Sequence, residues 1–332
     1  LFAAGFITLA ATRTDYNSLY TLVLLSVMFY MPTIALSNSV AYNALEKAGL
    51  DTVTHFPPIR VWGTVGFICA MWVVDLGKMG LSATQLYFSA TLGLILGLYS
   101  FTLPNCPINR SGGGKSIVDL LGLRAFALFK QRKMAIFFIF SMLLGMSLQI
   151  TNAFADGYIK SFGDTGIHGA KYLGTFGVEH STILISLSQI SETLCILLIP
   201  FFLKRFGIKR VMLIAMFAWV LRFALLGAGN PGPGVWMFIL SMIVYGVAFD
   251  FFNISGSLFV EKETSAAIRS SAQGVFMIMT NGLGALIGSY LAGWIVNHYG
   301  WPLSWYLFAG FSLVVAIVFA VIFKYKHDPN RI

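Results

Sequence analysis

The sequence predicts an all-α membrane protein, and three features support that fold class. Hydrophobic residues make up 57% of the chain and charged residues only 11%, and the mean hydropathy is +0.79. A soluble domain carries roughly 25% charged residues, so a chain of this composition could not cover its surface with polar groups. The apolar residues also fall into continuous runs separated by polar segments, and a bilayer accepts such an apolar exterior.

The apolar runs have the length and continuity of membrane-spanning helices. All but the first are long enough to cross a hydrocarbon core about 30 Å thick. Residues 1–11 reach only about 16 Å as a helix, so we expect them to end a helix that begins before Leu1. Strands of a β-barrel would alternate polar and apolar residues, which these runs do not. The runs are residues 1–11, 19–42, 59–76, 82–103, 134–155, 181–203, 211–228, 234–258, 270–296 and 302–323.

Basic residues are distributed unevenly between the two predicted sides of the membrane. If the C-terminus is inside, sixteen of the 22 Lys and Arg residues fall on the inner side and four on the outer side. This bias predicts a multi-pass protein with a cytoplasmic C-terminus, and it accounts for the net charge of +9 without a nucleic-acid partner. The inner set is Lys47, Arg110, Lys115, Arg124, Lys130, Arg132, Lys133, Lys204, Arg205, Lys209, Arg210, Lys262, Arg269, Lys324, Lys326 and Arg331, and the outer set is Arg13, Lys78, Lys160 and Lys171.

The longest polar segment, residues 104–133, divides the runs into two groups. It is basic, it follows the fourth run, and six full spans come after it. Two six-helix halves joined by a basic cytoplasmic loop are the plan of the major facilitator superfamily, so about ten of its twelve helices are expected here, the first of them partial. The predicted parts are an N-terminal bundle over 1–103 that lacks its first two helices, a linker over 104–133 and a C-terminal bundle over 134–332.

Two acids and one arginine inside the predicted spans are the first candidates for function. A charge at the centre of a membrane helix costs about 2.5–3.5 kcal/mol, so it is retained where it serves a pathway or a proton site. Glu192 and Asp250 both lie in the middle of their runs, and for them the functional interpretation is favoured. For Arg222, a purely structural pairing with a carboxylate stays open.

Amide side chains form a polar stripe on two further spans. Gln149, Asn152 and Asp156 have the spacing i, i+3 and i+7, and Gln189 lies three residues before Glu192, so each set shares a helix face. A single amide usually makes a helix–helix hydrogen bond, and that alternative remains open for each residue.

The third run begins with a short polar and aromatic face. Arg60, Thr64 and Phe67 have the spacing i, i+4 and i+7, which places them on one side of a helix. An arginine in this position can equally extend its side chain to the membrane interface, so position alone leaves both interpretations open.

These polar residues together suit a neutral, polar solute that contains a ring. Amides can match the donor and acceptor edges of a planar base, and a carboxylate can accept two sugar hydroxyls. Phe67, Tyr245 or Phe249 could stack against a ring. No metal-ligand cluster and no nucleophile–base pair has a recognisable spacing, so we expect no metal, no cofactor and no enzymatic activity.

Long segments of the chain resemble the bacterial nucleoside:proton symporter family, of the nucleoside permease G and xanthosine permease type, within the major facilitator superfamily. The resemblance implies a transporter of the bacterial inner membrane that imports nucleosides of the uridine, adenosine or xanthosine type with protons by alternating access. The segments that carry it are HFPPIRVWGTVGFICAMWVVDL (55–76), LLGLRAFALFKQRKMAIFFIFSMLLGMSLQITN (120–152), SLSQISETL (186–194), SMIVYGVAFDFFNISGSLFVEKE (241–263) and IRSSAQGVFMIMTNGLG (268–284).

The same resemblance implies a set of substrate-binding residues between the two halves. Asp250 matches an acid to which we assign proton coupling, with Glu192 as the second acid that could take this role. Two other functions stay open: transport of another neutral polar solute such as a sugar or sugar acid, and nucleoside sensing without transport. The implied nucleoside contacts are Arg60, Thr64, Phe67, Gln149, Asn152, Gln189, Glu192, Tyr245 and Phe249.

Overall fold

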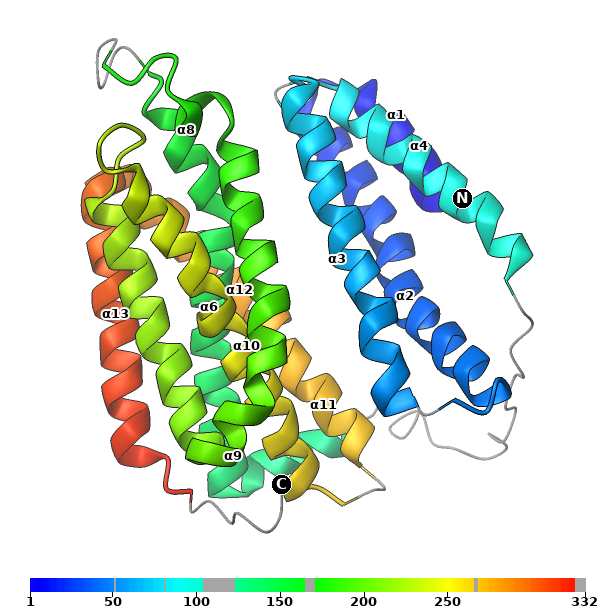
Figure 1. The fold of residues 1–332 in the computed structure, drawn as a ribbon, viewed down its shortest axis with the longest axis vertical. Helices are drawn as coiled ribbons and strands as arrows, with labels where there is room; N and C mark the ends of the chain where they lie inside the picture. The colour runs from blue at the N-terminus through cyan, green and yellow to red at the C-terminus, as the bar shows by residue number, and fades with distance from the viewer. Residues whose placement is uncertain (51, 81, 104–122, 165–170, 266–267, 326–332) are drawn as a thin grey trace. The chain divides into compact units, whose positions relative to one another are not determined.

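The computed structural model describes residues 1–332 except 51, 81, 104–122, 165–170, 266–267 and 326–332, and the described residues contain helices and no strands. The chain divides into two compact units, Leu1–Ser111 and Gly112–Ile332 (Figure 1). This division falls within the predicted linker 104–133. Most of that linker lies outside the described residues, so its cytoplasmic position stays a prediction.

The described residues of the first unit form four α-helices, and each overlaps one of the first four predicted apolar runs, with α4 shorter than the run 82–103. The Ser26 hydroxyl donates to the Ala3 carbonyl at 2.9 Å and joins the second helix to the first. Asp15 begins the second helix by accepting a hydrogen bond from the Ser18 amide at 2.9 Å, and the bonds with Ser18 lower the pKa of Asp15. The helices are α1 (Phe2–Ala11), α2 (Tyr16–Lys47), α3 (Thr52–Leu76) and α4 (Thr84–Tyr99), with the short 3-10 turn η1 (Ser100–Thr102) after α4.

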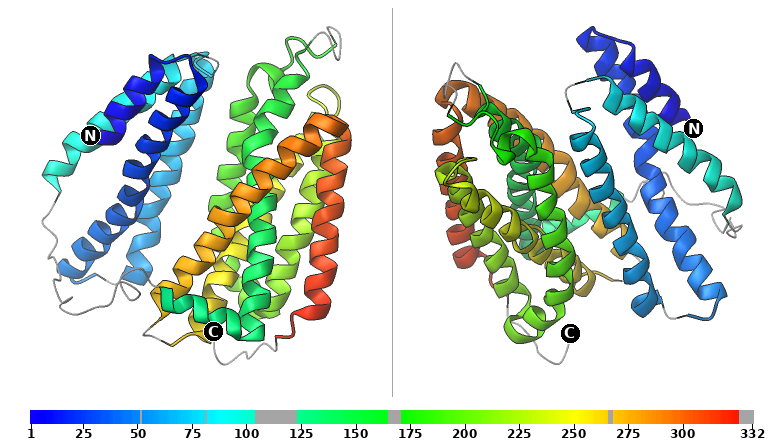
Figure 2. Two further views of the ribbon diagram at one scale, coloured as in Figure 1. Left: turned by 180° about the vertical axis from the view of Figure 1, so that it is seen from behind. Right: turned by 45° about the horizontal axis from the view of Figure 1, so that its top comes forward.

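The second unit contains the remaining six predicted runs. Five of its helical segments are long and apolar enough to cross a membrane. Seen from behind, α12 and α13 lie beside α6, the first long helix of the unit (Figure 2). The elements are η2 (Leu123–Lys130), α6 (Arg132–Ser161), α8 (Phe176–Glu179), α9 (Ser181–Ala228), α10 (Val235–Glu263), α11 (Arg269–Met277), the π-helix η3 (Ile278–Gly284), α12 (Ala285–Tyr299) and α13 (Trp301–Ile322).

The element α9 is two spans joined by a sharp reversal. As a straight helix its 48 residues would reach about 72 Å, more than twice the thickness of a hydrocarbon core. The reversal occurs at Gly207, whose φ of 76° and ψ of 165° are open to glycine and strained for other residues. Ser191 donates to the Ile243 carbonyl and Arg222 to the Ser241 carbonyl, so both arms pack on the same turn of α10. The separate runs predicted at 181–203 and 211–228 are these two arms.

Aromatic side chains fill the interior of the second unit where α6, α10 and α11 meet. The Phe137 ring on α6 lies 4.7 Å from the Phe259 ring and 5.4 Å from the Phe276 ring, measured between centroids. All three side chains are fully buried. Aromatic pairs at these separations add about 0.5–1.5 kcal/mol to the apolar burial itself, so they hold α6, α10 and α11 together where these helices meet.

The helix α6 approaches the π-helix η3 through a glycine. A Cβ atom on Gly145 would lie only 2.1 Å from the Thr280 carbonyl oxygen, which is a backbone atom and cannot move aside alone. Glycine is the residue that allows membrane helices to approach this closely. The position of η3 against α6 therefore depends on the absence of a side chain at residue 145.

Replacement of Gly145 by alanine is expected to destabilise the second unit. Overpacking of a close contact costs about 1–3 kcal/mol, because the helices must separate. Gly157 in the same helix has no atom within 4 Å of an added Cβ, so Gly157→Ala is the matched control. Thermal unfolding of the purified protein in detergent should show a lower midpoint for Gly145→Ala only. Equal midpoints for the two variants would contradict the close contact.

Candidate functional site

Tyr245 is the centre of a polar cluster inside the second unit. This side chain on α10 is 4% exposed, and the exposed Asn152 side chain on α6 lies near its hydroxyl. Glu192 and Asp250 are both near enough to interact with Tyr245 electrostatically. The Tyr245 ring also stacks on Phe249, with 5.8 Å between centroids. Side chains from α6, α9 and α10 that are predicted site residues are therefore brought together.

Arg222 lies on the second arm of α9 and holds three helices together. It is 1% exposed, and its Nε donates to Thr151 Oγ1 at 3.2 Å while Nη1 donates to the Ser241 carbonyl at 2.5 Å. Its guanidinium carbon lies 4.7 Å from the centre of the Tyr245 ring. Within the described part of the chain these partners are neutral groups, so the pairing of Arg222 with a carboxylate stays an untested alternative. The positive charge of Arg222 therefore lies beside the Tyr245 ring.

The two acids differ in their surroundings although they share Tyr245 as a neighbour. Asp250 is 3% exposed in the middle of α10 and interacts electrostatically with Tyr245 and with Cys195. Glu192 is half-buried in the middle of the first arm of α9. A deeply buried acid next to a more accessible one suits two different tasks, one on a proton and one on a solute.

Three other predicted residues of the second unit take up different positions. Gln149 and Gln189 are half-buried, each about one turn before Asn152 and Glu192, and in the described residues neither amide is hydrogen-bonded to Tyr245. Asp156 binds Lys160 at 2.7 Å and accepts a hydrogen bond from Ser181 at 2.6 Å. Asp156, the last residue of the predicted polar stripe, thus links the end of α6 to the start of α9.

The predicted residues of the first unit share one helix. Thr64 and Phe67 lie on α3, Thr64 half-buried and Phe67 exposed within that unit. Arg60 also belongs to α3, but its side chain lies outside the described residues. The predicted common helix is therefore confirmed, and the role of this face in binding stays a prediction.

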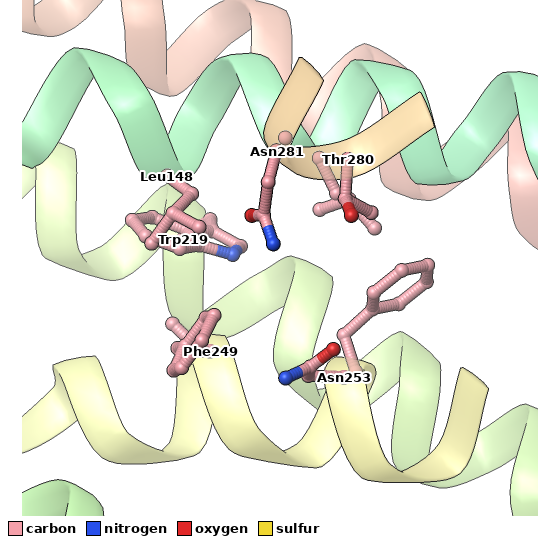
Figure 3. A pocket seen from close by; sticks show the side chains of 10 residues that line it. Leu148, Trp219, Phe249, Asn253, Thr280 and Asn281 are labelled. Carbon is pink, nitrogen blue, oxygen red and sulfur yellow. The ribbon is translucent and has the colours of Figure 1, made fainter. Parts of the chain in front are cut away.

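A small pocket of about 20 Å³ lies beside Phe249 in the second unit. In Figure 3 the amides of Asn253, from α10, and Asn281, from η3, point toward the same space, which Trp219 and Phe249 also border. Amides and aromatic rings are groups suited to hydrogen bonding and stacking, but the space between them has room for about one water molecule in this conformation. The lining residues are Leu144, Gly145, Leu148, Trp219, Ala248, Phe249, Phe252, Asn253, Thr280 and Asn281.

Sequence reasoning missed Trp219, Thr280 and Asn281 as pocket residues. Asn281 is an amide inside an apolar run, so the rule that selected Gln149 could have selected it too. The face on which it lies could not be predicted from a 3.6-residue period, because residues 278–284 form a π-helix. The Thr280 hydroxyl donates a hydrogen bond to the Phe276 carbonyl at 2.9 Å, four residues earlier in the chain.

The chemistry of this cluster favours binding over catalysis. In the part of the chain that the structure describes, no group of three or more His, Cys, Asp or Glu side chains could hold a metal ion. The amides, rings and carboxylates instead offer reversible contacts to an uncharged polar molecule.

A protein-family model described as the nucleoside H+ symporter matches residues 1–328. The chain belongs to the nucleoside H+ symporter family. Among curated relatives, this symporter is 52% identical over 332 residues to the nucleoside permease NupG of Escherichia coli K12, covering 97% of the chain and 78% of NupG. It is 50% identical over 339 residues to the xanthosine permease of the same organism, covering 100% of the chain and 80% of that permease.

Solved structures of NupG are similar to the symporter in fold. A crystal structure of an aspartate-to-alanine mutant of NupG has a TM-score of 0.91 at 51% identity, over 97% of this chain and 81% of that one. A second NupG crystal structure has a TM-score of 0.86 over 98% of this chain and 81% of that one. The predicted family and the major facilitator type of membrane transporter are confirmed, and these relatives are transport proteins rather than enzymes.

Proposed function

We propose that this symporter imports nucleosides together with protons across a bacterial inner membrane by alternating access, with its C-terminus in the cytoplasm. The observation that carries the proposal is the Tyr245 cluster, in which two membrane-embedded acids and an amide lie near enough to one tyrosine to influence it electrostatically. An apolar helix retains acids within the membrane at considerable cost, so their position around a ring-bearing side chain favours coupled movement of a proton and a ring-containing solute.

We assign the nucleoside contacts to both units. In the second unit, Glu192 accepts hydrogen bonds from ribose hydroxyls, and the Asn152 amide forms hydrogen bonds with the base. The rings of Tyr245 and Phe249, which stack on each other, pack against the plane of the base. The remaining predicted contacts are Gln149 and Gln189 in the second unit and Arg60, Thr64 and Phe67 in the first unit.

Proton coupling is assigned to Asp250. Its burial makes the charged form expensive, so protonation and deprotonation can favour different conformations of the transporter. One proton that moves inward across 100 mV supplies about 2.3 kcal/mol. That free energy supports roughly 40-fold accumulation of a neutral solute, since 1.4 kcal/mol corresponds to a factor of ten.

Proteoliposomes that contain the purified protein test this function. We expect uptake of labelled uridine that is accelerated by an inward proton gradient and is inhibited by unlabelled nucleosides but not by sugars. Competition by sugars at equal concentration would indicate a facilitator with another substrate. Nucleoside binding without counterflow would indicate a sensor, and either result would overturn the proposal.

A further inference from the structure

A basic cleft lies at one end of the second unit, away from the Tyr245 cluster. It is formed where α6 begins and α13 ends, and Asn152 lies twenty residues beyond Arg132 on α6, about 30 Å along the helix. Its volume of about 520 Å³ is large enough for a small-molecule headgroup rather than a single ion. The lining residues are Arg132, Lys133, Ile136, Val321, Ile322, Phe323 and Lys324.

The three cations of the cleft are not equivalent. Lys133 is fixed within the unit by an ion pair with Glu263 at 2.6 Å and lies 4.7 Å from the centre of the Tyr325 ring. Arg132 and Lys324 are exposed, and among the described residues neither lies within ion-pair distance of a carboxylate. Two positive side chains therefore remain for an anionic ligand.

The rest of the cleft wall is apolar and faces outward. Val321 is 69% exposed and Ile322 is 43% exposed on the last turn of α13, while Phe323 closes the interior side. Because α6 and α13 are membrane-spanning helices, their ends lie near the headgroup level of a bilayer. A soluble anion would use the cations but would leave this apolar wall uncovered.

We propose that this cleft binds an anionic phospholipid. Its phosphate lies between Arg132 and Lys324, and the first methylene groups of an acyl chain pack on Ile136, Val321 and Ile322. Cationic clefts between membrane helices are suited to anionic headgroups, and apolar side chains at the same depth accept the chain. The site is independent of nucleoside transport, since none of its residues belongs to the Tyr245 cluster.

Native mass spectrometry of the purified protein with equal amounts of phosphatidylglycerol and phosphatidylcholine of identical acyl chains tests this site. We expect preferential binding of phosphatidylglycerol to the unmodified protein. Each basic side chain near an anionic lipid contributes about fivefold in affinity, so the preference should fall about fivefold in Arg132→Gln or Lys324→Gln and about 25-fold in the double variant.

A matched control removes two other charges from the same end of the unit. Lys204 and Arg205 precede the reversal of α9, and Lys209 just after it donates to the Ala320 carbonyl of α13 at 3.0 Å, which places the reversal beside the end of α13. The double variant Lys204→Gln/Arg205→Gln should retain the preference. An equal loss in both double variants, or an unchanged preference in Arg132→Gln/Lys324→Gln, would overturn the proposal. Competition by glycerol 3-phosphate at the same concentration would show a free phosphate site and would overturn it too.

Discussion

Asp250→Asn should abolish the accumulation of nucleosides that a proton gradient drives while leaving nucleoside exchange intact. Asparagine has nearly the shape of a protonated aspartic acid but cannot release a proton, so the binding conformations persist and the coupling is lost. Accumulation across 100 mV should fall from up to about 40-fold to the equilibrium level. Proteoliposomes with an inward proton gradient measure accumulation, and counterflow of labelled uridine in the same vesicles measures exchange.

The control for this prediction is an acid at the end of a span. Asp156→Asn removes a carboxylate that binds Lys160 and Ser181, outside the Tyr245 cluster, so proton-driven accumulation should remain. Counterflow in the Asp250→Asn vesicles demonstrates that this variant is folded and binds nucleosides. If Asp250→Asn accumulates uridine as the unmodified protein does, the proton is carried elsewhere, and Glu192→Gln becomes the variant to measure.

Glu192→Gln should weaken nucleoside binding through the loss of a charge-assisted contact to the ribose. A hydrogen bond to a charged group contributes about 1.5–3 kcal/mol, so the KM for uridine should rise about 10- to 140-fold. The same variant should lose its discrimination against 2′-deoxyuridine or 3′-deoxyuridine, because the group that reads the missing hydroxyl has changed. Uptake of the three nucleosides by both proteins measures this difference.

Thr193→Val is the matched control for Glu192. Thr193 is the next residue on α9, and its hydroxyl bonds the Gln189 carbonyl within the same helix at 3.1 Å. Its replacement should leave the KM for uridine and the discrimination between ribose and deoxyribose unchanged. A Glu192→Gln protein that still discriminates between uridine and both deoxyuridines would show that the ribose is recognised by another residue.

The span pattern was predictable because each membrane helix satisfies its own backbone hydrogen bonds. A long apolar run in a bilayer has no alternative to a helix other than a closed barrel, so the run itself specifies the element. The sequence correctly predicted two separate runs on either side of Gly207. Helical geometry nevertheless continues almost up to this glycine on both sides. Only the conformation of Gly207 shows how the chain reverses.

The candidate site was predictable in part. Glu192, Asp250 and Asn152 were found because a polar group within an apolar run is costly whatever its partner. Their convergence on Tyr245 could not be deduced from spacing, because the residues come from three helices that are far apart in the sequence. The role of Arg222 was left open for the same reason, and its neutral partners on α6 and α10 emerge only from the packing.

The sequence by itself determined that this protein spans a membrane, where its spans lie and which polar residues they contain, since these properties depend on local hydropathy and a single helical period. The tertiary structure decided which polar residues meet, that a π-helix turns Asn281 into the pocket with Asn253, and that the ends of α6 and α13 form a basic cleft. Contacts between distant helices depend on side-chain packing in three dimensions, so they cannot be predicted from the periodicity of any single helix.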